Sequence, residues 1–183
     1  MEEEQVVEAI TKARKGISQY LEIMELFPKV NVAENGDFRR KFNAFYRVRQ
    51  RPREWYNIYF SYMQRVRDNK PSFADVLDDL YRSTGRYEPS FSSKLVATLD
   101  PEQPVWDVWV IKNTRTRVPS YSSRRKVEQA NAAYKGIQAW YRQFLNSKDG
   151  ELAVRSFDRI VPDHAKITNL KKVDFVLWQI RAS

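Results

Sequence analysis

Apolar side chains recur with the 3.6-residue period of an α-helix along almost the whole chain. The first such stretch ends before Pro28 and carries Val6, Val7, Ile10, Ile17, Tyr20, Leu21, Met24 and Phe27. A stripe of this kind is typical of an amphipathic helix that buries one face. Because later segments repeat the pattern, the sequence predicts an all-α fold, a compact multi-helix domain.

Capping and breaking residues divide the rest of the chain into further helices. Asn35-Gly36 marks a turn, after which we expect Asp37 to cap a helix that Pro52 interrupts. Ser72 is expected to cap a later helix. Together with breaks at Thr84-Gly85 and from Asn146 to Gly150, these signals predict helices near 38–46, 55–66, 73–84, 89–99, 127–144, 151–160 and 168–181.

One segment, Val105 to Ile111, is ambiguous. Its side chains alternate enough for a β-strand, whereas Asp107 is equally suited to cap a helix. We interpret the segment as helical, because the sequence offers no second strand with which it would pair.

Length and residue types limit the function classes. The chain has 183 residues, no cysteine and a single histidine, His164, so we expect no disulfide, no metal and no cofactor. No apolar run approaches the roughly 20 residues that a membrane helix needs, and the acidic start does not resemble a signal peptide. We therefore expect a cytoplasmic protein, with residues 1–36 as an N-terminal helix and connection docked on a helical domain, 37–183.

Positive charge is concentrated in two stretches that contain no acidic residue. The chain carries 32 Lys and Arg against 23 Asp and Glu, a formal net charge of +9. The first stretch holds Arg39, Arg40, Lys41, Arg47, Arg49, Arg51 and Arg53, and the second holds Lys112, Arg115, Arg117, Arg124, Arg125 and Lys126. Guanidinium groups donate paired hydrogen bonds to phosphate, so the stretches predict a track for nucleic acid, with DNA as the expected partner. The alternative is two solvated faces whose acids lie elsewhere on the surface.

The segment from Thr84 to Ile111 reads as helix, turn, helix and contains two short motifs, Phe91-Ser-Ser-Lys94-Leu and Pro104-Val-Trp-Asp107. Here the sequence resembles the helix-hairpin-helix DNA glycosylase superfamily, particularly bacterial proteins with an 8-oxoguanine glycosylase-like fold. In that superfamily a hairpin delivers a lysine and a Pro-Val-Asp-type stretch delivers an aspartate. Two flanking stretches look like further elements of these proteins: Phe42 to Arg49 with Trp55, and Asp174 to Trp178.

The resemblance implies base-excision chemistry on a nucleotide flipped out of DNA. Lys94 and Asp107 would be the catalytic residues, Lys94 as the amine nucleophile and Asp107 as the group that stabilises positive charge on the sugar. Gly85 and Arg86 in the hairpin turn would contact the DNA backbone. Tyr87, Trp106 and Trp109 would be candidates for stacking on a base.

Other readings stay open at this point. The superfamily's hairpin normally has a Leu-Pro-Gly-x-Gly turn, whereas this chain has Gly85 alone, and its Lys94 to Asp107 spacing is shorter than in the established bifunctional enzymes. Asp107 also suits a plain helix cap and the tryptophans suit a core. The alternatives are a non-catalytic nucleic-acid binding module of a repair or defence system, and a basic helical protein-interaction domain.

Overall fold

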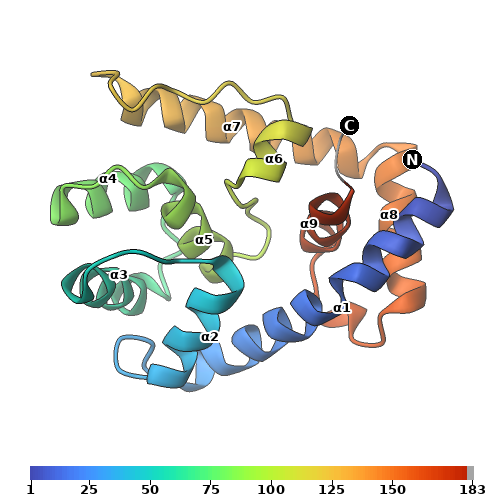
Figure 1. Ribbon diagram of the computed structural model, residues 1–183, viewed down its shortest axis with the longest axis horizontal. Helices are drawn as coiled ribbons and strands as arrows, with labels where there is room; N and C mark the ends of the chain where they lie inside the picture. The colour runs from blue at the N-terminus through green and yellow to red at the C-terminus, as the bar shows by residue number, and fades with distance from the viewer. Residues whose placement is uncertain (181–183) are drawn as a thin grey trace.

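The computed structural model describes residues 1–180, in which nine α-helices and two short 3-10 helices form the fold and no β-strand occurs (Figure 1). The α-helices are α1 Glu3–Leu26, α2 Gly36–Tyr46, α3 Arg53–Val66, α4 Phe73–Thr84, α5 Pro89–Leu99, α6 Val108–Asn113, α7 Lys126–Leu145, α8 Lys148–Ile160 and α9 Asn169–Gln179, and the 3-10 helices are η1 Phe27–Lys29 and η2 His164–Lys166. The all-α prediction is confirmed. The predicted end of the last helix, Arg181, lies outside the described residues, as does the end of the predicted 37–183 domain.

The first and last helices are in contact. α1 packs against α9, α8 and α2, while α7 packs against α4, α8 and α9 (Figure 1). One cluster of buried apolar side chains runs through all of these elements, from Val6 in α1 to Leu177 in α9. None of the helices within residues 1–180 has the length and apolar character needed to cross a bilayer.

The cap of α2 differs from the prediction. Asn35, and not Asp37, is the N-cap, because its side chain accepts a hydrogen bond from the Phe38 N–H at 2.8 Å. Asp37 lies in the first turn of the helix, where its negative charge still suits the positive end of the helix dipole. Pro52 precedes the first residue of α3, as the interruption there predicted.

The predicted break between α7 and α8 is too long. It covers little more than Asn146 and Ser147, and the Ser147 side chain caps α8 by accepting from the Gly150 N–H. Gly150 lies inside the first turn of α8, and a β-carbon there would overlap the backbone carbonyl of Phe144. This glycine therefore permits a close approach of two helices and does not act as a helix breaker.

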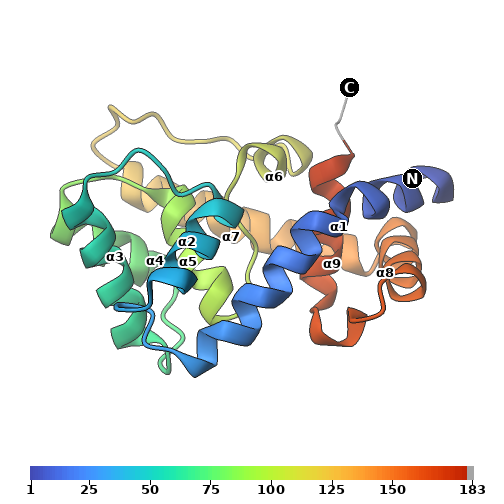
Figure 2. The ribbon, with the colours of Figure 1, turned by 60° about the horizontal axis from the view of Figure 1, so that its bottom comes forward.

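The predicted start and end of α4 and the helical interpretation of residues 105–111 are confirmed. Ser72 caps α4 in a reciprocal capping box with Asp75, and Gly85 ends the helix in the left-handed conformation with φ +67°. The ambiguous segment forms α6, a helix whose N-cap is Asp107. Between them, α5 runs through the middle of the molecule and packs against α4 (Figure 2).

Candidate active site

Lys94 lies on a helix that is buried along most of its length. α5 begins with Pro89, and every residue from Ser92 to Leu99 is buried. The Lys94 side chain is only 8% exposed, and its Nζ lies 5.1 Å from the centroid of the Phe91 ring. Lys94 is therefore not a solvated lysine on an amphipathic turn, because the helix has no exposed face at this position.

Asp107 combines a capping role with a half-buried carboxylate. Its Oδ1 accepts hydrogen bonds from the N–H groups of Trp109 at 2.8 Å and Val110 at 2.9 Å. These bonds fix the start of α6. Because both reach Oδ1, the cap holds the carboxylate in one orientation.

A hydrogen bond between neighbours of the two residues holds their backbones together. The N–H of Trp106, which precedes Asp107, donates to the hydroxyl of Ser93, which precedes Lys94, at 2.8 Å. The loop between α5 and α6 is also anchored by the Tyr134 hydroxyl, which donates to the Pro104 carbonyl at 2.7 Å. The sequence motifs gave no hint of the part that Ser93 plays here.

The two side chains influence each other's protonation. The pKa of Lys94 is lowered to about 8, chiefly by burial; the carboxylate of Asp107 opposes the shift, the charge of Arg47 adds to it, and the carboxylate of Glu88 opposes it. Burial raises the pKa of Asp107, the hydrogen bond from the Val110 N–H opposes this, and the charge of Asp174 adds to the rise. Because its pKa is lowered towards neutral pH, Lys94 forms a neutral amine more readily than an ordinary lysine, whose pKa is about 10.4.

The hairpin turn between α4 and α5 contacts both basic stretches. On one side, Arg51 Nε donates to Glu88 Oε1 at 2.7 Å, in an ion pair that is mostly buried. On the other side, the Tyr87 hydroxyl donates to the Lys126 carbonyl at 3.3 Å, and the Tyr87 ring meets that of Tyr121 edge to face at 5.3 Å. Two stretches of chain that are far apart in sequence therefore meet at the turn that leads to Lys94. The connection between α2 and α3 and the connection between α6 and α7 both run along the upper side in Figure 2.

Several residues of the predicted basic track form hydrogen bonds or ion pairs within the protein. Arg39 donates to the carbonyls of Val32 and Ala33, and its pKa is lowered by burial. Lys41 pairs with Glu22 at 3.1 Å. Arg40, Arg51 and Arg125 are held in ion pairs, with Asp37, Glu88 and Glu128 respectively.

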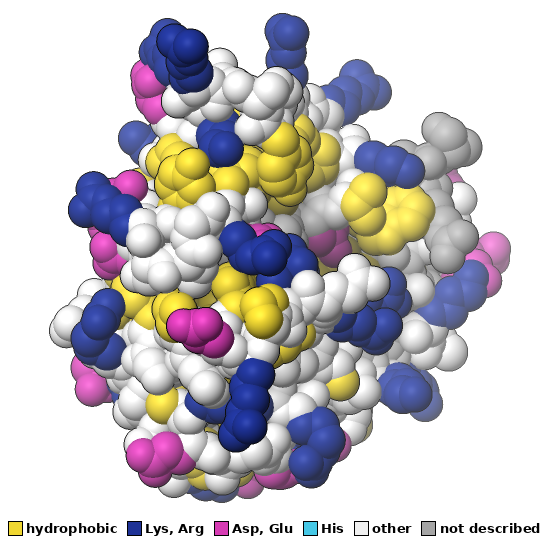
Figure 3. Space-filling view, turned by 60° about the vertical axis from the view of Figure 1, so that its left-hand side comes forward, with side chains coloured by type: hydrophobic (Ala, Val, Ile, Leu, Met, Phe, Trp, Pro, Cys, Tyr) yellow, Lys and Arg dark blue, Asp and Glu magenta, His cyan; other side chains and the backbone are white. Residues whose placement is uncertain are grey.

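The remaining basic residues face solvent. Within residues 1–180, the exposed arginines that form no ion pair include Arg47, Arg49, Arg53, Arg86, Arg115, Arg117 and Arg124. Lys112 lies over the Trp109 ring at 4.7 Å, and Lys126 lies 5.4 Å from the Tyr87 ring centroid. Figure 3 shows Lys and Arg side chains spread over the face that forms the left-hand side of Figure 1, some of them bordering a hollow near its centre. Acidic atoms are visible in that hollow.

The aromatic candidates for base stacking lie in different environments. Trp106 is 5% exposed and stacks on Phe73 with the rings 6° from parallel, so its ring belongs to the core. Tyr87 is also buried, and burial raises its pKa to about 12. Trp109 is half-buried at the surface of α6, beside Lys112.

A buried charged network on α9 adjoins these residues. Lys171 Nζ lies 2.8 Å from Asp174 Oδ2 with both side chains fully buried, and the Tyr141 hydroxyl donates to the other carboxylate oxygen. The charge of Asp174 is one cause of the raised pKa of Asp107. The sequence carried a signal for this network, since Lys171 and Asp174 stand one helical turn apart in an otherwise largely apolar helix.

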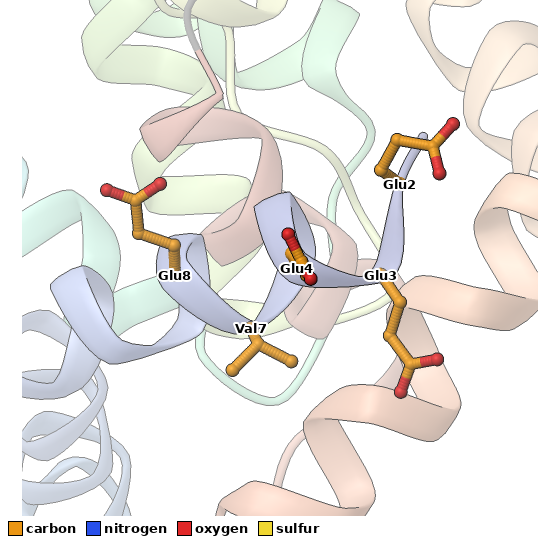
Figure 4. A pocket seen from close by; sticks show the side chains of 5 residues that line it. All are labelled: Glu2, Glu3, Glu4, Val7 and Glu8. Carbon is orange, nitrogen blue, oxygen red and sulfur yellow. The ribbon is translucent and has the colours of Figure 1, made fainter.

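A surface hollow elsewhere on the molecule has a different character. It measures about 810 Å³ beside the first turns of α1 and is lined by Glu2, Glu3, Glu4, Val7 and Glu8 (Figure 4). Its carboxylates point in different directions in Figure 4. A hollow rimmed by four acids repels phosphate, so the chemistry of Lys94 and Asp107 is the better guide to a site.

A neutral amine can add to an electrophilic carbon, and a nearby carboxylate can stabilise the positive charge that develops there. Within residues 1–180 no cluster of His, Asp and Glu side chains is suited to a metal ion.

Comparisons with protein-family models, with curated proteins and with solved structures found no match.

Proposed function

We propose that this chain binds DNA and acts on a damaged or modified base that is flipped out of the duplex, in the manner of helix-hairpin-helix DNA glycosylases. The observation that supports this most is the buried Lys94, whose pKa is lowered and whose charge interacts with that of Asp107. The hairpin turn between two basic stretches supports DNA as the ligand, because the exposed arginines there suit phosphate.

The chemistry follows from the two groups. The bond between base and sugar cannot be reached in a stacked duplex, so the nucleotide leaves the stack. As the base departs with the bonding electron pair, Asp107 stabilises positive charge on the sugar. The lone pair of the neutral Lys94 amine forms a bond to C1′. The C1′–O4′ bond then breaks, O4′ takes up a proton that the nitrogen loses, and a protonated imine joins Lys94 to the opened sugar.

The test is borohydride trapping with duplexes that carry abasic, 8-oxoguanine, uracil or alkylated sites. Wild type is expected to form a covalent adduct that Lys94→Gln does not form, because the glutamine amide is not a nucleophile. Lys15→Gln, which removes an exposed lysine of α1, is the matched control and is expected to trap normally. Base release is scored in the same samples, because trapping reports only the imine.

Each other outcome assigns another function. Base release without an adduct, abolished by Asp107→Asn, would indicate a glycosylase without lyase activity. Bound DNA with neither product would contradict catalysis and leave a nucleic-acid binding module. No binding even at low salt would contradict the DNA proposal and leave a basic protein-interaction domain.

A further inference from the structure

The exposed large apolar side chains of the described residues gather on one surface segment. They are Val108 at 59%, Val118 at 43% and Tyr121 at 69% exposure, and all lie on α6 or on the connection that joins it to α7. We call residues 114–125 the Tyr121 loop. Tyr121 is the most exposed of the three and the only one with an aromatic ring, whose flat apolar faces are available to a ligand.

The structure holds Tyr121 in one orientation. The Ser122 and Ser123 N–H groups donate to the hydroxyl and carbonyl of Ser120, at 3.3 and 3.1 Å, and close a tight turn around it. Lys126 Nζ donates to the Tyr121 carbonyl at 3.3 Å, and the ring rests edge to face on Tyr87. A ring fixed in this way loses little conformational freedom when a ligand stacks on it.

The charge around Tyr121 defines what kind of ligand fits. Arg115, Arg117 and Arg124 are exposed, and the stretch from Lys112 to Lys126 contains no acidic residue. A hollow of about 590 Å³ beside the loop is lined by Arg117, Val118 and Ser120, among others. A flat exposed ring in a chain segment that carries several unpaired guanidinium groups suits a ligand that has both planar apolar faces and negative charges, which is the chemistry of an unpaired nucleotide.

We propose that the Tyr121 loop binds an unpaired DNA strand, with a base stacked on Tyr121 and phosphates held by Arg115, Arg117 and Arg124. This inference rests on the proposed function for the choice of DNA, since flipping a base leaves unpaired nucleotides near the hairpin turn. Tyr87 of that turn contacts Tyr121, so the loop is adjacent to the place where the duplex would open. The protein is then expected to bind gapped or single-stranded DNA more tightly than intact duplex.

The test measures binding of a fluorescent oligothymidine and of a duplex of equal length by anisotropy. Tyr121→Ala is expected to weaken oligothymidine binding by roughly 5-fold to 100-fold, the range that one stacked base contributes, and duplex binding much less. Tyr121→Phe keeps the ring and is expected to bind like wild type. The double variant Arg117→Ala with Arg124→Ala is expected to bind oligothymidine more weakly and with a smaller salt dependence. Arg155→Ala, which removes an exposed arginine of α8, is the control and is expected to bind like wild type.

Unchanged oligothymidine binding by Tyr121→Ala would overturn the proposal. So would an equal loss in Tyr121→Phe and Tyr121→Ala, because the ring would then not be the contact. The proposed function can fail on its own. If wild type shows neither trapping nor base release but still binds single strands through Tyr121, only the glycosylase activity is contradicted. If wild type forms the trapped adduct but Tyr121→Ala binds oligothymidine as wild type does, only the proposal for the Tyr121 loop is contradicted.

Discussion

Two buried lysines of this chain have pKa values that shift in opposite directions. Burial favours the neutral form of both, but Lys171 has the Asp174 carboxylate 2.8 Å away and lies over the Tyr20 and Trp178 rings, so its pKa rises above the ordinary value. Lys94 forms no ion pair within residues 1–180, and its pKa falls to about 8. Lys171 therefore stays charged at neutral pH, while Lys94 gives up its proton more readily than an ordinary lysine.

Burying Lys94 destabilises the fold at neutral pH. Its pKa is lower in the folded chain than in the unfolded chain, so the unfolded state binds more protons between pH 8 and pH 10.5. The cost is fully present below pH 8 and disappears as pH rises through that window. Lys94→Met is therefore expected to stabilise the protein at pH 7 by on the order of 1–3 kcal/mol.

Urea denaturation of both proteins at pH 7 and at pH 10 measures this difference. The stabilisation is expected to be largest at pH 7 and to shrink at pH 10. A gain of the same size at both pH values would mean that packing of the new side chain, and not removal of a buried charge, is its cause.

At the scale of the helices, two glycines of the α7 to α8 region are expected to respond in opposite ways. Gly150→Ala places a β-carbon on the Phe144 carbonyl and is expected to destabilise the protein by about 1–3 kcal/mol or more. Gly136 lies inside α7 with no atom within 4 Å of an added β-carbon. Gly136→Ala is therefore expected to stabilise by about 0.5–1 kcal/mol, through the helix preference of alanine.

Thermal denaturation of the two variants, followed by circular dichroism, compares these effects. The pair serves as its own control, because the substitution is the same and only the surroundings differ. If Gly150→Ala melted at or above the wild-type temperature, α7 and α8 could not approach as closely as described.

The helices could be predicted because their signals are local. Apolar spacing and caps such as Ser72 and Asp107 act within one or two turns, so the sequence contains them in full. The cap of α2 was wrongly assigned to Asp37, because Asn35 and Asp37 both suit the role. The choice depends on tertiary bonds that hold the 31–35 connection, including that from the Val32 N–H to Gln64.

The surroundings of the candidate site were less accessible from the sequence. Lys94 and Asp107 were named from a resemblance, and their chemical roles stay predictions. The Arg51 to Glu88 ion pair and the contact of Tyr87 with Tyr121 join residues more than 30 positions apart, and no local pattern marks them. The absence of acidic residues between Arg39 and Arg53 likewise did not reveal that Arg39 donates hydrogen bonds to backbone carbonyls and that Lys41 pairs with Glu22.

At the scale of the whole molecule, duplex binding is expected to depend on the exposed arginines near the hairpin. Arg47→Ala with Arg49→Ala should weaken binding and reduce the slope of log Kd against log salt by about 1.8 if each arginine meets one phosphate. Titrations at several salt concentrations measure the slope, with Arg142→Ala and Arg155→Ala as a charge-matched control. If the control pair changed the slope as much, binding would depend on net charge and not on this surface.

The contact between α1 and α9 has a consequence for synthesis on the ribosome. The α1 residues packed against α9 cannot gain that partner until translation has passed Asn169, where α9 begins. Chains grow at roughly 5–20 residues per second, so a nascent α1 waits several seconds with its apolar stripe uncovered. During that interval the growing chain is a natural client for chaperones, although the finished fold buries the same surface.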